Sequence, residues 1–559
     1  MAFTWLITTA QPLPPVPPQA TPGVLQQQLR RMVPEPSITD KAPTPIPVPA
    51  FTYPSGAEAI RLTVRTVELS GNTAIPTAEL APNWADMTDR EVPATAIYDL
   101  ANTLTSIYRN RGYVLSAVLV TQDVVKDGLP DGVLRLHVIE GYVGRVQFDP
   151  ELENSPRIRE EAQVIMRERP LTIRTLERQL LIINDIPGVA AQAYLDAAGP
   201  PGEAVLTLKT ARNSVSGFAG IQNRVSELLG NVLIEGRVSL FNAFGQDEAQ
   251  TLLLQTTETS RLRSLGYAYD QPLGTSGLMF NGFLAHIESK SSLTEADLFR
   301  QSDFLSEVVR STSDIATFGV AYPLIRGRGE TLRVRGRFNI YDGKQKGELL
   351  QIEQQERVRA LRVGLSWDRS DASGINFANA DVSQGIPGLG STSSDSPTAI
   401  RRDADYGFSK VDFLAGRLQR LGGDFSLLAS VQGQWTNDRL PSSERAALGG
   451  ELILRAFDAG DLIGDRAAAG KLELRYEPAL IPGGRVTFYA YAEVGRTTSI
   501  EIAPIPNLVS RGSDTGLGVR GSLANGVNFY AEVATPHEVY RVPTRSRSTR
   551  FFTGLSYQF

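Results

Sequence analysis

Cysteine is absent from this chain of 559 residues, and histidine occurs only three times. Without cysteine, the chain can form neither a disulfide framework nor a thiolate metal site. His137, His286 and His537 lie far apart in the sequence, which disfavours a histidine-based catalytic centre. We therefore expect neither a metal ion nor a cofactor, and no enzymatic activity.

A basic excess and long apolar runs are also missing. Lysine and arginine number 56 against 61 aspartate and glutamate residues, a formal net charge of −5. This balance gives no sign of a nucleic-acid partner. No apolar run reaches the roughly 18 residues that a membrane-spanning helix needs. A membrane β-barrel stays possible, because each of its strands needs only about 9–11 residues of alternating pattern.

The first 50 residues divide into three segments. Residues 1–21 combine an apolar start with a proline-rich stretch, and we interpret them as the remnant of an export signal or, alternatively, as an unstructured terminus. Residues 22–33 predict a helix, with Thr21 as N-cap and Pro22 at its first position. Residues 34–50 are proline-rich and predict an extended linker. At about 3.1 Å per residue this linker could span about 50 Å, more than the ~30 Å bilayer core.

The helix predicted at 22–33 is mostly polar. Leu25, Leu29 and Met32 share one face, and glutamine and arginine residues, including Arg30, cover the rest. An isolated helix of about three turns is marginal in water. We therefore expect it to dock inside the molecule, and its polar surface favours a polar cavity.

Two α/β modules are predicted next, over residues 51–142 and 143–211. Each shows a strand, then helical periodicity, then two further strands. In the first module these elements lie at 61–69, 97–108, 114–120 and 133–141. In the second they lie at 144–149, 155–169 with 172–185, 189–196 and 204–210. The common order predicts a repeated architecture. If strand 114–120 or 133–138 is an edge strand, it could pair with a segment of an unfolded client protein.

From residue 212 to residue 559, the alternation of apolar and polar residues replaces helical periodicity. At about 21 residues per strand and connection, this length suits about 16 strands. Short turns such as 272–274 alternate with long polar stretches such as 291–308 and 385–406. A soluble all-β protein of this size would be expected to divide into domains. The pattern instead predicts a single antiparallel membrane barrel.

The last nine residues carry a pattern that is typical of the final strand of an outer-membrane barrel. They place four apolar residues on one face and end the chain on an aromatic ring: Phe551, Leu555, Tyr557 and Phe559.

One stretch within the predicted barrel is unlike its surroundings. Residues 446–470 contain a loop bounded by glycines that is unusually apolar for a surface loop, with Leu452, Ile453, Leu454 and Phe457. Its candidate motif is Leu454, Arg455, Ala456 and Phe457. Apolar residues in a long loop need something to pack against. The alternative is a surface loop with a solvated arginine.

Taken in order, these features resemble the outer-membrane transporters of two-partner secretion, the haemolysin secretion/activation (TpsB) family, which is related to the barrel-assembly protein BamA. The resemblance covers nearly the whole chain. Stretches similar to the first POTRA domain of the family are 67–75, 108–120 and 138–146, and 176–189 is similar to the second. Stretches similar to successive barrel features are 242–254, 321–329, 383–388 and 448–465.

The resemblance implies a mixed fold, with two periplasmic POTRA domains followed by a 16-stranded antiparallel transmembrane β-barrel. It implies a Gram-negative outer-membrane pore that captures an unfolded TpsA-type exoprotein through the POTRA domains and secretes it. Outer-membrane lipid and the barrel-assembly machinery are the other implied partners. The helix at 22–33 is expected to plug the lumen.

The resemblance also implies that the loop folds into the barrel lumen. In the family, the arginine of a V-R-G-Y/F motif meets an acid in an F/G-x-D-x-G wall motif. Carried over, these residues are Arg455 and Glu493. This sequence departs from the family at Ala456, where the motif has glycine, and at Glu493, where it has aspartate. A glycine can serve a positive φ, so we expect a different loop backbone here. A charge in a confined lumen is costly unless paired, which favours the Arg455–Glu493 pair.

Three alternatives are weighed against secretion. A BamA-type insertase would assemble other barrels, but only two modules are visible here. A passive porin would need no POTRA domains. Residues 516–521 match G-x-G-x-x-G, but a dinucleotide site requires a following helix, and the residues around this stretch predict strands.

Overall fold

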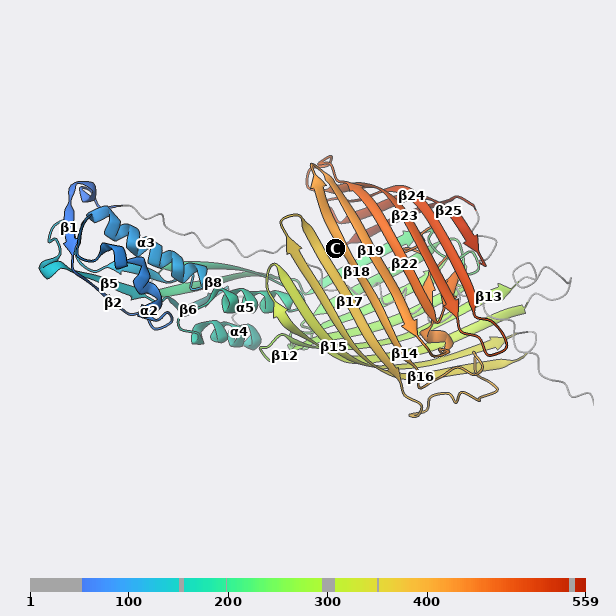
Figure 1. Cartoon of the computed structure of the whole chain (residues 1–559). Coiled ribbons are helices and arrows are strands. Elements are labelled where there is room, and N and C mark those ends of the chain that lie inside the picture. Colours follow the sequence, from blue (N-terminus) through green and yellow to red (C-terminus); the bar gives the residue numbers. More distant parts are fainter. Residues whose placement is uncertain (1–52, 150–154, 198, 294–306, 349–350, 542–547) are drawn as a thin grey trace, which may run out of the picture.

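The computed structural model describes residues 53–149, 155–197, 199–293, 307–348, 351–541 and 548–559. Two α/β modules form one end of an elongated molecule and a large β-barrel forms the other (Figure 1). The segments predicted at 1–21, 22–33 and 34–50 lie outside the described residues. Among the residues described, no helix is both long and apolar enough to cross a membrane.

Helix α3 (Ala94–Asn110) organises the first module. Its apolar residues recur every three or four positions and are buried against a three-stranded sheet. The sheet has the order β2 (Thr66–Ser70), β5 (Val133–Ile139) and β4 (Ala117–Val120), with β5 parallel to β2 and antiparallel to β4. The smaller elements are η2 (Ala57–Ala59), β1 (Arg61–Val64), α2 (Thr77–Leu80), η3 (Ala81–Asn83), η4 (Ala85–Met87), β3 (Arg90–Pro93) and η5 (Pro130–Gly132).

The prediction of one continuous strand over 61–69 is wrong, because this segment forms two strands separated at Arg65. The Arg65 amide donates a hydrogen bond to the Gly132 carbonyl oxygen at 2.8 Å. On either side of this residue the chain pairs with different partners: β1 pairs with β3, whereas β2 pairs with β5.

The second module has the same sheet order and strand directions as the first. Its elements are β6 (Tyr142–Phe148), α4 (Pro156–Arg167), α5 (Ile173–Asp185), β7 (Val189–Ala197) and β8 (Glu203–Arg212). The central β8 is parallel to β6 and antiparallel to β7. The side chains of Ser155 and Thr172 cap the two helices by accepting hydrogen bonds from backbone amides in the first turn.

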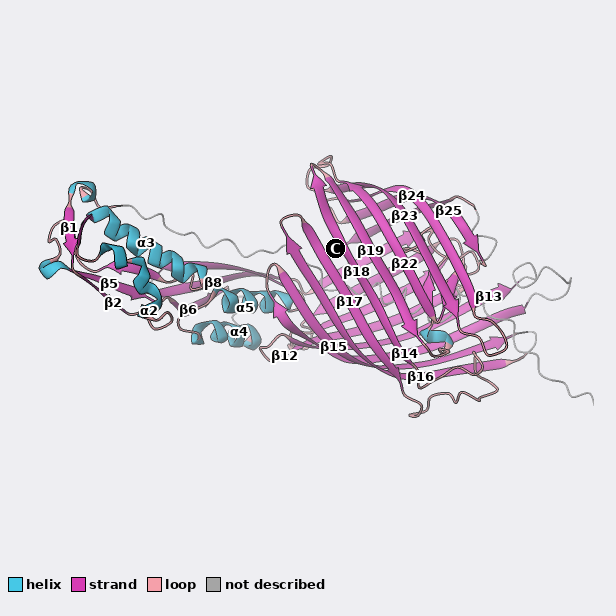
Figure 2. Ribbon diagram, viewed as in Figure 1, coloured by secondary structure: helices cyan, strands magenta, loops and turns pink. Residues whose placement is uncertain are grey.

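The rest of the chain forms a closed barrel of antiparallel strands, which confirms the predicted fold (Figure 2). The barrel contains sixteen strands: β9 (Val215–Gln222), β10 (Leu233–Phe241), β11 (Ala249–Thr257), β12 (Leu262–Leu273), β13 (Leu278–Leu293), β14 (Glu307–Arg326), β15 (Glu330–Gly347), β16 (Glu353–Asp371), β17 (Gly374–Gly385), β18 (Ser409–Gly422), β19 (Phe425–Thr436), β22 (Arg466–Tyr476), β23 (Arg485–Ser499), β24 (Leu508–Ser522), β25 (Val527–Tyr540) and β26 (Arg550–Gln558). The 516–521 stretch lies inside β24, so it is strand and not the strand–turn–helix of a nucleotide site.

The two faces of the barrel wall differ in polarity. Along β23, Phe488 and Val494 are exposed on the outside, whereas Tyr491 and Glu493 are buried on the inside. Strands expose alternate residues on opposite faces, and an apolar outer face with a polar interior is the pattern of membrane barrels. The four apolar residues of the C-terminal pattern are exposed on the outer face of β26 and just beyond it: Phe551, Leu555, Tyr557 and Phe559.

Charged contacts join the second module to the nearest turns of the barrel. Asp185, at the end of α5, accepts two hydrogen bonds from Arg326 of β14, at 2.7 and 2.9 Å. Arg178 of α5 donates to the carbonyl oxygens of Ser276 and Pro323, at 3.2 and 3.1 Å. The module is therefore attached to the end of the barrel that carries the short turns (Figure 1).

Candidate functional site: a loop folded into the barrel

The connection between β19 and β22 turns into the barrel. It begins with a short 3-10 helix, η6 (Ser442–Glu444), and continues as a hairpin of β20 (Ala446–Leu448) and β21 (Leu462–Gly464). At its tip, Leu454, Ala456 and Phe457 are buried. They belong to one apolar cluster with the wall residues Tyr489, Tyr491 and Phe552. The apolar residues of the loop therefore pack against the inner wall.

The backbone of the tip contains positive φ angles at positions other than 456. Gly449 and Gly450 have φ angles of 110° and 93°, and the Gly450 amide donates to the Phe457 carbonyl oxygen at 2.9 Å. Leu454 has a φ angle of 56°, whereas Ala456 is not among the residues with positive φ. Alanine at 456 therefore carries no left-handed strain. That the loop backbone differs here from that of family members with glycine at this position stays a prediction.

Two wall glycines leave room for the tip. A Cβ atom at Gly495 would lie 2.8 Å from Cδ1 of Leu454, and one at Gly512 would lie 3.0 Å from Cζ of Phe457. The loop can approach β23 and β24 this closely because these positions have no side chain.

Arg455 lies at the centre of a buried group of carboxylates. Its Nε atom is 3.0 Å from Glu493 Oε1, the predicted partner, and its backbone amide donates to Oε2 of the same residue at 3.0 Å. Its Nη2 and Nη1 atoms are 2.8 Å from Glu473 and 3.2 Å from Glu532. The guanidinium also lies 3.4 Å above the Tyr491 ring. Arg455 is only 4% exposed, so the three carboxylates take the place of water around its charge.

Further charges complete this group. Glu473 is also contacted by Lys471 at 3.5 Å, Arg475 at 2.8 Å and Arg520 at 3.0 Å. Asp514 accepts a hydrogen bond from the Ala456 amide at 2.6 Å. Buried charges are tolerated when each has partners. Here arginines and a lysine pair with the acids of β22, β23 and β25, and a backbone amide binds the acid of β24.

The sequence analysis missed Glu473, Asp514 and Glu532 as members of the site. Glu532 lies in the alternating region 212–559, where alternation alone could have indicated an inward acid. Which inward acids reach Arg455 depends on how neighbouring strands are aligned, and that alignment is a property of the closed barrel.

The base of the loop is held by two more buried acids. Both carboxylate oxygens of Glu444 in η6 accept a hydrogen bond from Nη2 of Arg362, at 2.6 and 2.8 Å. Glu444 also lies 3.1 Å from Lys410. Asp465, directly after β21, accepts from the Leu440 amide at 2.9 Å and binds Arg401 at 2.8 Å. Ion pairs therefore hold the loop at its base as well as at its tip.

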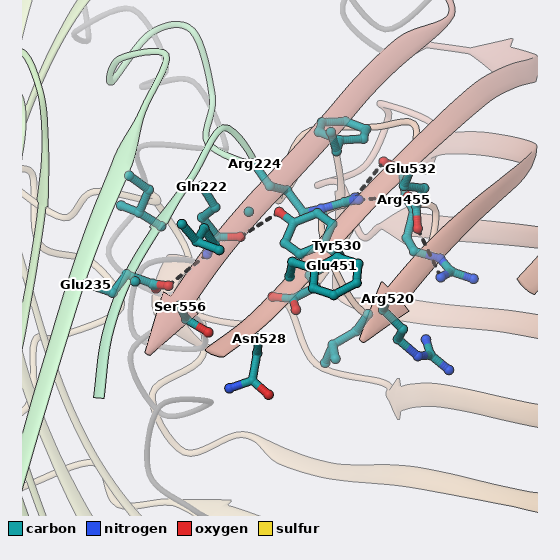
Figure 3. A pocket seen from close by; sticks show the side chains of 18 of the residues that line it. Gln222, Arg224, Glu235, Glu451, Arg455, Arg520, Asn528, Tyr530, Glu532 and Ser556 are labelled. Carbon is teal, nitrogen blue, oxygen red and sulfur yellow. Dashed lines mark hydrogen bonds and ion pairs between the residues drawn. The ribbon is translucent and has the colours of Figure 1, made fainter. Parts of the chain in front are cut away.

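A cavity of about 830 Å³ lies beside the tip inside the barrel (Figure 3). Its lining combines apolar side chains with charged groups of both signs, and its polar residues include Arg224, Glu235, Arg520, Asn528 and Tyr530. Among the described residues, no cluster of histidine, aspartate and glutamate is arranged to hold a metal ion.

Comparison with known proteins identifies the family. The family model described as haemolysin secretion/activation protein ShlB/FhaC/HecB matches residues 202–516, more than half of the chain. The chain belongs to the haemolysin secretion/activation family. The model of the ShlB-type POTRA domain matches residues 62–141, so the first α/β module is a POTRA domain.

Several individual proteins are similar over most of their length. The outer membrane transporter CdiB of Escherichia coli is 23% identical over 477 residues, 82% of this chain and 77% of that protein. CdiB of Dickeya dadantii is 24% identical over 482 residues, 84% and 80% of the two chains. The heme/hemopexin transporter protein HuxB of Haemophilus influenzae is 22% identical over 397 residues, 70% and 67% of the two chains.

Solved structures of CdiB share the fold. The structure from Escherichia coli has a TM-score of 0.74 at 20% identity and covers 96% of this chain and 98% of its own. The structure from Acinetobacter baumannii has a TM-score of 0.62 at 15% identity, with 96% of each chain covered.

Membership of the haemolysin secretion/activation family makes this chain an outer-membrane protein-secretion transporter, with its POTRA domain in the periplasm. The barrel end that carries the modules therefore faces the periplasm. The opposite end, which carries the long connections, faces the outside of the cell.

Proposed function

We propose that this transporter captures one unfolded TpsA-type exoprotein in the periplasm and passes it through the barrel lumen to the cell surface. The loop held inside the closed barrel by Arg455 is the observation that carries this proposal. The lumen is occupied by a loop with a small apolar tip whose arginine is held by reversible ion pairs, so the loop can be rearranged to let an extended chain pass. We further propose that the protein is not an enzyme, in keeping with its membership of a family of secretion transporters.

Capture is assigned to the α/β modules, with the second module, 143–211, acting as a second POTRA domain. Of the two candidate edge strands in the first module, β5 is central and β4 (Ala117–Val120) is an edge. In the second module β7 (Val189–Ala197) is an edge. Leu119 and Tyr194 on these strands are 43% and 38% exposed. An extended client segment could add to either edge by backbone hydrogen bonds and cover these side chains.

The N-terminal segments are assigned to gating. We propose that the helix at 22–33, reached through the linker 34–50, plugs the lumen at rest. Deletion of residues 1–33 should then raise single-channel conductance in planar bilayers. Unchanged conductance would show that this helix does not plug the lumen.

Two further partners follow from the barrel surface. The exposed apolar residues on the outer face, among them Val494, Leu517 and Phe551, are proposed to contact outer-membrane lipid. The C-terminal strand, which ends in exposed Tyr557 and Phe559, is proposed to be recognised by the barrel-assembly machinery during insertion.

Deletion of 51–142 in cells that produce the partner exoprotein tests the capture step. We expect export to stop while the barrel stays in the outer membrane and keeps its heat-modifiable mobility in gels. Continued export would contradict capture by the first POTRA domain. Loss of other outer-membrane barrels after deletion of the whole gene would instead favour the BamA-type insertase.

A further inference from the structure

The barrel has its shortest strand junction where the first strand meets the last. β9 and β26 pair over five residues, from Gly554 opposite Gln222 to Gln558 opposite Phe218. Each of the other fifteen junctions has at least eight such pairs. Hydrogen bonds between Gly217 and Phe559 and between Asn223 and Thr553 extend this seam only slightly. Because backbone hydrogen bonds are the main link between strands, the seam has the least intrinsic support.

The tip of the inward loop is bound from both sides of this seam. On one side, Arg224, two residues after β9, donates from Nη1 to the Arg455 carbonyl oxygen at 3.0 Å. On the other side, Arg550, the first residue of β26, donates from Nη1 to Asp458 at 2.6 Å. The two arginines therefore bind the two ends of one four-residue stretch of the loop, 455–458.

The aromatic ring of Phe552 joins the two arginines. It projects inward from β26, is 2% exposed, and has the guanidinium carbons of Arg224 and Arg550 at 3.9 and 4.9 Å from its centroid. Arg224 also pairs with Glu532 at 2.7 Å, and Glu532 binds Arg455 as well (Figure 3). The seam and the charged group around Arg455 thus share one buried network.

We propose that Arg224 and Arg550 are positioning residues that couple the inward loop to the barrel seam. While the loop is docked, the network reinforces the β9–β26 junction, and release of the loop loosens it. A coupling of this kind is reciprocal, so a locked seam holds the loop in place. This inference concerns barrel closure and goes beyond the proposed secretion function, and it can be tested on the purified protein without any client.

Hydrogen exchange measured by mass spectrometry tests the first direction. In the double variant Arg224→Gln with Arg550→Gln, exchange in residues 218–222 and 551–558 should accelerate by about tenfold or more, as expected for lost hydrogen bonds to buried charged groups. The matched control is Arg335→Gln, which removes another inward arginine paired at 3.0 Å, to Asp381, far around the barrel. Unchanged exchange at the seam in the double variant would overturn the proposal. So would an equal acceleration in the control.

A locked seam tests the reverse direction in a protein that keeps every native charge. Ile221 and Leu555 are register partners across the seam and both are exposed on the outer face. The chain has no other cysteine, so Ile221→Cys with Leu555→Cys can form only one intramolecular disulfide. Oxidation should slow exchange in residues 453–458 relative to the reduced form of the same protein. With Arg224→Gln and Arg550→Gln added, oxidation should no longer protect the loop. Equal loop exchange in the oxidised and reduced forms of the first protein would refute the coupling.

Discussion

The interior of the barrel contains many more buried charges than the interior of the POTRA module. Around α3 the buried residues are apolar, such as Leu104 and Tyr108. Around the inward loop, Glu473, Glu493 and Arg455 are just as deeply buried. Apolar burial stabilises in proportion to area and has no direction, whereas a buried charge depends on a particular partner. The module core therefore maintains a fold, and the charged interior of the barrel fixes the position of a loop.

Removal of Arg455 should give the largest effect. Arg455→Ala leaves Glu473, Glu493 and Glu532 without their shared cation, and breaking a buried pair costs about 3–5 kcal/mol. We expect the loop to leave its position and secretion to be lost, while strand pairing keeps the barrel heat-modifiable. Export of the partner exoprotein measures this effect, with Arg417→Ala as the control, since that arginine is 32% exposed. Full secretion by Arg455→Ala would mean that secretion does not depend on the contacts of this arginine.

A charge swap tests whether Glu493 alone, or all three acids together, bind Arg455. If Glu493 were the only partner, Arg455→Glu combined with Glu493→Arg would recover part of the secretion that either single change loses. In this structure a carboxylate introduced at position 455 would face Glu473 and Glu532, so we expect little recovery. Recovery to near the wild-type level would mean that these two acids contribute little.

A cavity in the module core should have the next largest effect, and of a different kind. Leu104 is fully buried on α3, and truncation of such a leucine costs about 2–5 kcal/mol. In Leu104→Ala we expect the first module to unfold at a lower temperature while the β-barrel transition is unchanged. Circular dichroism at the helical wavelength follows the modules, and gel mobility follows the barrel. A parallel loss of barrel stability would show that the two regions are not independent.

Glu161 of α4 is a buried carboxyl group within the second module. Burial raises the pKa of Glu161 to about 8, from an ordinary value of 4.5. Between these values the folded module keeps a proton that the unfolded chain releases, so stability should fall as pH rises from about 4.5 to about 8 and then level off. Glu161→Gln should remove this slope. Thermal unfolding of the helical signal at several pH values measures it, and an unchanged slope in the variant would exclude Glu161 as its source.

The smallest effect is expected at the module surface. Arg111 and Glu79 form an ion pair whose side chains are 48% and 46% exposed. Such a pair contributes about 0–1 kcal/mol. Arg111→Gln should therefore leave thermal unfolding and secretion near wild type, and a marked loss of secretion would point to a client contact at this position.

Prediction from the sequence succeeded where the relevant pattern is local. The spacing from Ile97 to Tyr108 indicated α3, and alternation indicated the barrel strands. It failed at Arg65, because the strand is divided by a change of partner from β3 to β5, and both partners lie far along the chain. Alternation also cannot show that Glu473 and Glu532 reach the same guanidinium, since strand alignment around a closed barrel decides this. Glu493 was found only because a family motif marks its position.

Labelling of a single cysteine tests most directly whether the charged group holds the loop inside the barrel. Leu454 is fully buried at the tip, and the chain has no native cysteine. In Leu454→Cys, a water-soluble maleimide applied to intact cells should react very slowly. With Glu493→Gln and Glu532→Gln added, the loop should leave the wall and the same cysteine should react rapidly. Equal slow labelling in both proteins would contradict the account, because the loop would then stay docked without its charged partners.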